Sequence, residues 1–150
     1  MKVLVLSDIH DHIDKLNKVV EAIKGKVEAA IFCGDMVSPF TTGLLAKIDV
    51  PIYACLGNND EDQIGLLKKG GPIFIWTNLS QELGEIELDK RKIAFCHYPK
   101  LAELLAKSGD YDAVFYGHTH VTRSEMFGKT LLLNPGSVCG IIGGKMAVAS

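Results

Sequence analysis

The sequence predicts an α/β fold in which two mixed β-sheets pack face to face and helices cover their outer faces, a four-layer α/β/β/α sandwich. Two observations lead to this prediction. In the first half of the chain, short apolar runs alternate with segments of helical periodicity, as in βαβ units of a parallel sheet. From residue 73 onward, apolar runs follow one another mostly without long crossovers, which favours a second, strand-rich sheet.

The first half of the sequence supplies strands and the helices that connect them. We expect strands over 2–7, 29–33 and from Pro51 onward, and helices over 11–25, 41–48 and 60–70. Apolar residues recur at helical spacing in the first helix, and Gly25 marks its end. The third helix has acids at its start and lysines at its end, which suits the helix macrodipole. The segment 36–40 is predicted to be a loop.

The second half of the sequence supplies mostly strands. We expect strands over 73–76, 85–88, 91–96, 112–116, 121–127 and 130–134, and one helix over 99–108. Turns are predicted at 89–91 and 134–137, and Pro99 falls in the first turn of the helix, where proline is tolerated. No linker, repeat or low-complexity tract interrupts the sequence, so we expect a single domain over residues 1–150.

The composition is that of a compact soluble protein, with 47% hydrophobic and 23% charged residues. A net charge of −2 argues against a nucleic-acid-binding protein that works through a basic surface. The sequence has no signal peptide and no apolar run of about 18 residues, so we expect no membrane segment and a cytoplasmic location. The four cysteines are expected to be buried thiols in a reducing compartment. They are Cys33, Cys55, Cys96 and Cys139.

Five short apolar runs each end at side chains that bind metal ions well. These side chains are Asp8 and His10, Asp35, Asn58, His97, and His118 and His120. Ligands of open α/β sheets bind beyond the carboxyl ends of the strands, so we expect the seven side chains to form one site. On an extended segment, residues two apart point to the same face. Two pairs have this spacing, Asp8 with His10 and His118 with His120, and each pair is therefore expected to converge on one point.

The composition of this set indicates which metals it would bind. Carboxylate, amide and imidazole ligands without thiolate suit Mn, Fe, Zn, Co or Ni better than Ca or Mg. Seven ligands are too many for one tetrahedral ion but suit two ions that share a carboxylate. Two ions about 3.5–4 Å apart are the usual arrangement for phosphoester hydrolysis. We therefore expect two divalent ions, with Mn first among the candidates, and a small phosphoester as substrate.

The sequence resembles the calcineurin-like metallophosphoesterases over nearly its whole length. The resemblance is carried by the motifs DIH (8–10), GD (34–35), GNND (57–60), CH (96–97) and GHTH (117–120). More narrowly, the chain is similar to the small single-domain prokaryotic phosphodiesterases, whose fold is also that of the retromer subunit Vps29. Several motifs in the right order are a stronger signal than any one of them.

The resemblance implies a role for each ligand. One ion would be held by Asp8, His10, Asp35 and His120, and the other by Asp35, Asn58, His97 and His118. Asp35 would bridge the two ions, and a hydroxide between them would attack phosphorus. The residues expected to act in catalysis are Asp35, Asn58, Asn59 and His97.

The chain departs from the larger relatives at three positions around this site. Asn59 stands where they carry a histidine that protonates the leaving oxygen, Ser38 where an aspartate orients that histidine, and Pro39 where an arginine holds the phosphate. An asparagine amide has no proton to give near neutral pH, so we expect small diesters or esters with a good leaving group. Family members usually continue for another strand or two, and the sequence leaves open whether this chain is naturally short or clipped.

Other interpretations stay open from the sequence alone. A protein-interaction scaffold similar to Vps29, which retains the metal site, is the alternative to an enzyme, although the complete ligand set favours the enzyme. A homo-oligomer is compatible with the sequence. His12 is expected to be a solvated residue at a helix start, with a place at the site rim as the alternative, and Asp11 a helix cap. Asp60 either orients a ligand histidine or caps the helix over 61–69.

Overall fold

The computed structural model describes residues 1–77, 82–138 and 147–149, and the backbone forms two five-stranded sheets. The first has the order β10-β1-β2-β3-β4. Its strands are β1 (Val3–Leu6), β2 (Ala29–Cys33), β3 (Ile52–Cys55), β4 (Phe74–Trp76) and β10 (Ala147–Ala149). β1 to β4 run parallel, whereas β10 is antiparallel to β1.

The second sheet has the order β5-β6-β7-β9-β8. Its strands are β5 (Leu83–Leu88), β6 (Arg91–Cys96), β7 (Ala113–Phe115), β8 (Arg123–Phe127) and β9 (Thr130–Asn134). The inner strands β6, β7 and β9 are parallel, and the edge strands β5 and β8 are antiparallel to their neighbours. Both sheets are therefore mixed, as predicted.

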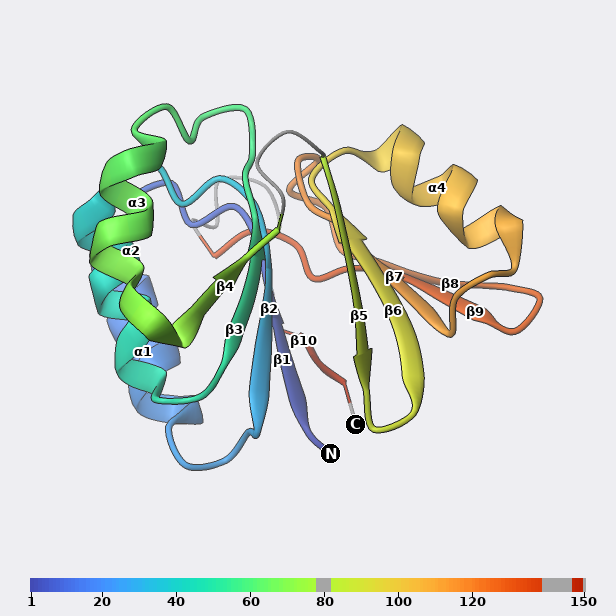
Figure 1. The fold of residues 1–150 in the computed structure, drawn as a ribbon, viewed down its shortest axis with the longest axis horizontal. Helices are drawn as coiled ribbons and strands as arrows, with labels where there is room; N and C mark the ends of the chain where they lie inside the picture. The colour runs from blue at the N-terminus through green and yellow to red at the C-terminus, as the bar shows by residue number, and fades with distance from the viewer. Residues whose placement is uncertain (78–81, 139–146, 150) are drawn as a thin grey trace.

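Helices cover the outer faces of the two sheets (Figure 1). The helices are α1 (Ile13–Ile23), α2 (Pro39–Leu45), α3 (Gln63–Gly70) and α4 (Pro99–Ser108), with short 3₁₀ turns η1 (Ala46–Ile48) and η2 (Gly71–Ile73). The first three lie on the first sheet and α4 on the second, which confirms the four-layer α/β/β/α prediction. Over the described residues, no helix has the length and hydrophobicity that a membrane span requires.

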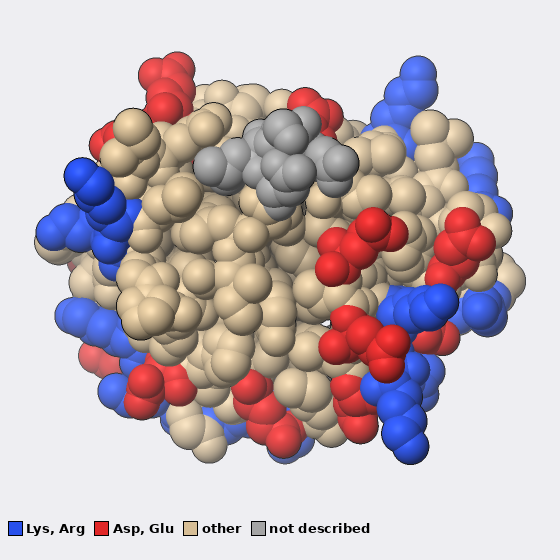
Figure 2. Space-filling model, in the orientation of Figure 1, with Lys and Arg blue, Asp and Glu red and all other residues tan. Residues whose placement is uncertain are grey.

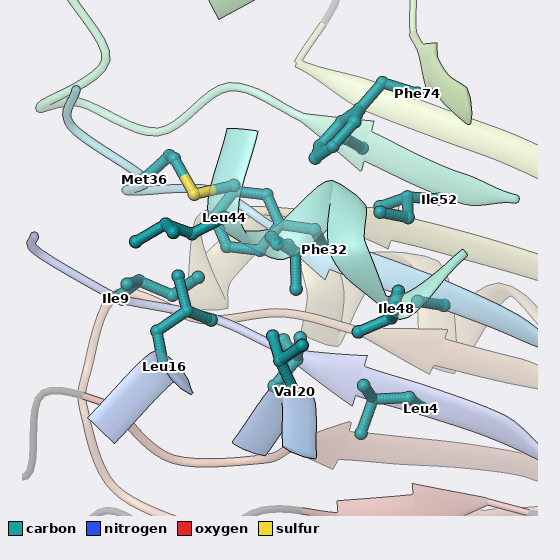
Figure 3. Close-up of a cluster of buried hydrophobic side chains, with 14 of the residues drawn as sticks. Leu4, Ile9, Leu16, Val20, Phe32, Met36, Leu44, Ile48, Ile52 and Phe74 are labelled. Atoms are coloured by element: carbon teal, nitrogen blue, oxygen red, sulfur yellow. The ribbon is translucent and has the colours of Figure 1, made fainter. Parts of the chain in front are cut away.

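Alternation along the strands of the first sheet divides its side chains between two apolar layers. Leu4, Leu6 and Phe32 point toward the helices, whereas Val5 and Ile31 point toward the second sheet. Figure 3 shows the helix-side layer, where strand residues meet side chains of α1, α2 and η1. The labelled residues include Leu4, Phe32, Ile52, Phe74, Leu16, Val20, Leu44 and Ile48. A third layer lies between the second sheet and α4.

Some predicted boundaries differ from the structure for identifiable reasons. The second helix starts at Pro39, inside the predicted loop, because Ser38 accepts the Thr41 N–H at its N-terminus and proline suits the first helical position. The third helix starts at Gln63, because Asp62 is its N-cap. The strand β10 was not predicted. Other predicted strand ends differ from those observed by one or two residues.

Figure 2 shows the charges on one face of the molecule, and the structure describes three of the four cysteines. Acidic and basic side chains are interspersed around the rim of the face in Figure 2, with a largely uncharged area over its middle. Cys33, Cys55 and Cys96 are buried free thiols, as predicted. Burial raises the pKa of all three, that of Cys96 to about 12. The prediction for Cys139 lies outside the described residues.

Candidate metal centre

The seven predicted ligands all follow the carboxyl ends of strands, at the upper edge of both sheets in Figure 1. The loops after β1, β2 and β3 contribute from the first sheet, and those after β6 and β7 from the second. Glycines bring these loops close together. A Cβ at Gly57 would lie 2.2 Å from Asp35 Oδ1, and one at Gly34 would lie 2.6 Å from His97 Nδ1. No other residue type fits at either position.

The backbone at the ligands differs from the extended conformation that the sequence suggested. Left-handed backbone angles occur at Asp8 (φ 54), His10 (φ 46), Asp35 (φ 64), His118 (φ 70) and His120 (φ 60). Asp8 and His10 therefore approach each other through sharp turns beyond the strand end and not through the alternation of a strand. His118 and His120 do not converge on one point, because His118 Nδ1 lies beside Asn58 Oδ1 and His120 Nε2 beside Asp8 Oδ1. The prediction for this second pair was wrong, since it assumed extended backbone where both residues adopt left-handed angles.

A first group of ligand atoms surrounds Asp8 Oδ1. His120 Nε2 lies 3.3 Å and His10 Nε2 3.6 Å from this oxygen, and His10 Nε2 also lies 3.2 Å from Asp35 Oδ2. Asp8 Oδ1 and His10 Nε2 are buried and have no hydrogen-bond partner among the described residues. Buried polar atoms are rarely left in this state, and a cation between these atoms would satisfy both.

The other oxygen of Asp8 is fully engaged within the protein. Asp8 Oδ2 accepts hydrogen bonds from the Ser7 hydroxyl and, at 3.0 Å, from the His118 N–H. Asp8 is completely buried, so these two donors fix the orientation of its carboxylate. Oδ1 is thereby directed at the two histidines.

A second group surrounds Asn58 Oδ1. His97 Nε2 lies 2.9 Å and His118 Nδ1 3.0 Å from this oxygen, and the two nitrogens are 3.2 Å apart. Ligand atoms about 2.0–2.2 Å from one ion lie about 3–3.5 Å from one another in tetrahedral or octahedral geometry. The observed separations match that spacing, so the residues present fit a metal ion here.

The hydrogen bond made by Nδ1 determines which nitrogen of the neutral His97 ring carries the proton. His97 Nδ1 lies 2.7 Å from the carbonyl oxygen of Cys33, which can only accept a hydrogen bond, so Nδ1 carries the proton. In the neutral ring the lone pair of Nε2 then points into the second group, as metal-binding histidines require, whereas in the charged ring Nε2 carries a proton that it donates to Asp35. Burial lowers the pKa of His97, but the hydrogen bond and charge of Asp35 outweigh it and raise the pKa above its usual value.

Asp35 lies between the two groups. Its Oδ2 is 3.2 Å from His10 Nε2 in the first group and 3.4 Å from His97 Nε2 in the second. Asn59 donates its backbone N–H to Oδ1 and its side-chain amide to Oδ2, both at 2.9 Å. Burial raises the pKa of Asp35, but the hydrogen bonds from His97 and Asn59 outweigh it, so the pKa lies well below its usual range.

Other residues singled out in the sequence lie around the centre without entering either group. His12 is exposed and immediately precedes α1. Asp11 does not cap α1, because its Oδ1 accepts the Ser38 N–H at 3.0 Å and the Thr41 hydroxyl, which ties the first loop to α2. Asp60 is not the cap of α3, since Asp62 accepts the Gly65 N–H there.

Two residues at the centre were not predicted. Ser7 holds the Asp8 carboxylate, and the half-buried ring of Tyr98 packs against His97 and His118, with centroids 5.1 and 5.2 Å apart. The only sequence signal for either was its position beside a predicted ligand.

Facing mixed sheets whose strand ends gather carboxylate, amide and imidazole ligands define a protein of the metallophosphoesterase class. The chain belongs to the calcineurin-like phosphoesterase superfamily, whose domain model matches residues 1–149. The family is one of metal-dependent phosphoester hydrolases, and the chain is an enzyme of this type.

Individual relatives agree with this assignment. The chain is 35% identical to phosphodiesterase MJ0936 of Methanocaldococcus jannaschii over 147 residues, which cover 96% of this chain and 88% of that protein. A solved archaeal phosphodiesterase superposes with a TM-score of 0.90 at 32% identity, covering 100% of this chain and 93% of that one. Vps29 of Chaetomium thermophilum has a TM-score of 0.76 at 16% identity, with 100% and 79% covered, and shares the fold alone.

Proposed function

We propose that the protein hydrolyses small phosphodiesters or activated phosphoesters with two divalent metal ions. The observation that carries this proposal is the position of Asp35 Oδ2, which belongs to both groups of ligand atoms. When bound, two such ions acidify a water molecule and neutralise charge on the phosphoester. Asp8 Oδ1 and His10 Nε2 are buried and lack a hydrogen-bond partner within the described part of the chain, which supports a cation in the first group.

The residues would divide between the ions as follows. The first ion is held by Asp8, His10, His120 and Asp35, and the second by Asp35, Asn58, His97 and His118. We propose Mn²⁺ for both, because the ligands are oxygen and imidazole nitrogen, with Ni, Co, Zn or Fe as alternatives. Asn59 holds the carboxylate of Asp35 in place through two hydrogen bonds.

The nature of the leaving group follows from the residues beside the centre. The Asn59 amide is occupied with Asp35 and has no titratable proton, so the leaving oxygen must depart as an anion or take its proton from water. Aryl esters meet this requirement, and the half-buried Tyr98 ring beside His118 offers an aromatic group a surface to pack against. A diester carries one negative charge and depends less on a cationic side chain at position 39.

The proposal is tested by metal analysis and a substrate panel on the same preparation. Elemental analysis should give two ions per chain after loading with Mn²⁺. The chemical-step rate should fall steeply as the leaving group becomes less acidic, with bis-aryl phosphates fast and alkyl phosphomonoesters slow. Similar rates for alkyl and aryl phosphomonoesters would show that another residue already donates the proton.

A paired substitution sharpens this test. Asn59→His with Ser38→Asp should improve alkyl monoesters by up to about 10²-fold and change aryl diesters little, because general acid catalysis contributes about 10²–10⁴-fold. Aspartate at 38 also caps a helix well, so α2 should tolerate it. The gain is limited because Asn59→His removes the amide that holds Asp35.

A metal-retaining interaction scaffold is the alternative function. The similarity to Vps29 at 16% identity shows the fold alone and does not favour that function. A protein that binds two ions but hydrolyses no member of the panel would support the scaffold over the enzyme.

A further inference from the structure

We propose that Asp60 is a positioning residue that locks together the two loops carrying Asp35 and Asn58 and thereby sets the affinity for both metal ions. The inference rests on the proposed dimetal function. It assigns a third role to Asp60, distinct from the two that the sequence left open.

Asp60 is a buried carboxylate whose two oxygens bind backbone groups of both loops. The residue is 3% exposed. Oδ2 accepts the N–H of Asp35 at 2.9 Å and the N–H of Gly57 at 2.7 Å, and Oδ1 accepts the N–H of Val37 at 2.8 Å. Hydrogen bonds to an ionised acceptor are roughly twice as strong as neutral ones, so three of them hold these segments firmly.

The three donors belong to residues that determine where the ligands lie. Asp35 is itself the ligand shared by the two groups, and Gly57 immediately precedes Asn58. The two loops follow β2 and β3, neighbouring parallel strands in which Cys33 pairs with Cys55. Asp60 therefore ties the loops to each other just beyond the last paired residues of these strands.

The conformation of the first loop explains why such a tie is needed. Asp35 and Val37 both have left-handed backbone angles, with φ of 64 and 83. A β-branched residue in this region is an outlier that persists only when its surroundings hold it. The N–H groups of both residues converge on Asp60, as backbone amides do around a bound anion. The carboxylate of Asp60 thus occupies the place that a bound anion takes in such a loop.

The two other roles fit the contacts less well. The N-terminus of α3 is capped by Asp62, which accepts the Gly65 N–H at 2.9 Å. Both Asp60 oxygens are engaged with backbone N–H groups, and among the described residues the hydrogen bonds of Asp60 do not reach a ligand histidine. Asp60 therefore acts on the metals through the backbone.

The test compares Asp60→Asn with Asp62→Asn, a carboxylate two residues away that caps a helix. The asparagine keeps the volume but leaves at least one backbone N–H facing an amide donor. Mn²⁺ binding is measured by titration calorimetry, and the coupled Mn²⁺ pair is followed by electron paramagnetic resonance. We expect Asp60→Asn to weaken both ions by about 10- to 100-fold, as other substitutions behind metal ligands do, and to lose the coupled signal. Asp62→Asn should retain both properties.

A second control separates positioning from general loss of stability. Val20→Ala removes buried side-chain atoms from the second half of α1, which supplies none of the proposed ligands, and should lower the melting temperature while leaving Mn²⁺ affinity unchanged. If Asp60→Asn does not fold, Asp60→Glu takes its place, with a smaller expected loss because it keeps the charge.

The outcomes are distinguishable. Unchanged Mn²⁺ affinity in the Asp60 variant, or a loss no larger than that of Val20→Ala, would overturn the role of Asp60. A wild-type protein that binds one ion would contradict the dimetal function, and the same comparison of variants would still decide the role of Asp60. A wild-type protein that binds none would overturn both.

Discussion

Non-glycine residues with left-handed backbone angles are unevenly distributed between the two ends of the sheets. Among the described residues, ten non-glycine residues have positive φ, and seven of them lie in the loops at the carboxyl ends of the strands. These seven are Asp8, His10, Asp11, Asp35, Val37, His118 and His120. The other three, Asp49, Asp89 and Lys90, lie in connections at the opposite end.

The surroundings of these residues explain the difference. Asp49, Asp89 and Lys90 are exposed. Asp49 is the left-handed C-cap of η1, and Asp89 and Lys90 form the tight turn between β5 and β6. At the ligand end, Asp8 and Asp35 are buried, and their carboxylates are held by donors from other loops. Strained backbone and buried charge in one place are typical of a functional site. We therefore expect this end of the molecule to be less stable than it could be, because its backbone is held in the geometry of the ligands.

The largest effect that tests this contrast is expected from Asp35→Asn. The substitution removes the charge shared by both ligand groups, so we expect both ions to bind more weakly and hydrolysis to fall by at least about 10²-fold. Calorimetry with Mn²⁺ and a diesterase assay measure the two effects. Asp112→Asn is the matched control at the opposite end, where Asp112 accepts the Lys92 N–H at 2.8 Å. A fully active Asp35→Asn protein with one ion would contradict the shared role of Asp35.

The histidines should divide between the two ions. His120→Ala is expected to weaken the ion that we propose Asp8 and His10 to hold, and His118→Ala the ion proposed for Asn58 and His97, each by at least about 10-fold. His12→Ala should leave metal content intact, because His12 is exposed and outside both groups. Elemental analysis after dialysis against limiting Mn²⁺ separates the variants. Loss of an ion in His12→Ala but not in His120→Ala would show that the ligand assignment is wrong.

The sequence predicts the order of elements well where a pattern is local. Short apolar runs predict nearly every strand, and helical spacing of apolar residues predicts the helices, because both patterns follow from burial. The start of α2 was missed although Ser38 and Pro39 form a helix-start signal. The strand β10 was missed because its pairing with β1 joins residues at opposite ends of the chain, which no local pattern reveals.

The sequence predicts that the seven side chains gather at one edge, but not how the loops hold them there. All seven predicted ligands lie at one edge because strand ends meet there. The left-handed turns at Asp8 and His118, and the donors that orient Asp8, were not predictable, since they depend on loops from different strands. The contacts of Asp60 reach back as far as Asp35, so its role depends on how two loops pack.

The smallest predicted effect is a difference in unfolding free energy between two glycine variants, which compares backbone strain at the two ends of the sheets. Val37→Gly relieves a β-branched residue at φ 83, whereas Asp49→Gly replaces a residue that already tolerates φ 61. Both variants gain backbone freedom in the unfolded chain, so most of that cost cancels in the comparison. Val37 does not belong to the apolar layers of the described core, so losing its side chain should cost little. In urea unfolding of metal-free protein, we expect Val37→Gly to be more stable than Asp49→Gly by about 1 kcal/mol, the low end for one strained residue.

Val37→Gly should also bind Mn²⁺ several-fold more weakly than the wild-type protein, because a glycine at 37 lets the loop leave the conformation that Asp60 holds. Equal effects of the two glycines on stability and on Mn²⁺ binding would mean that the ligand end stores no more strain than an ordinary turn.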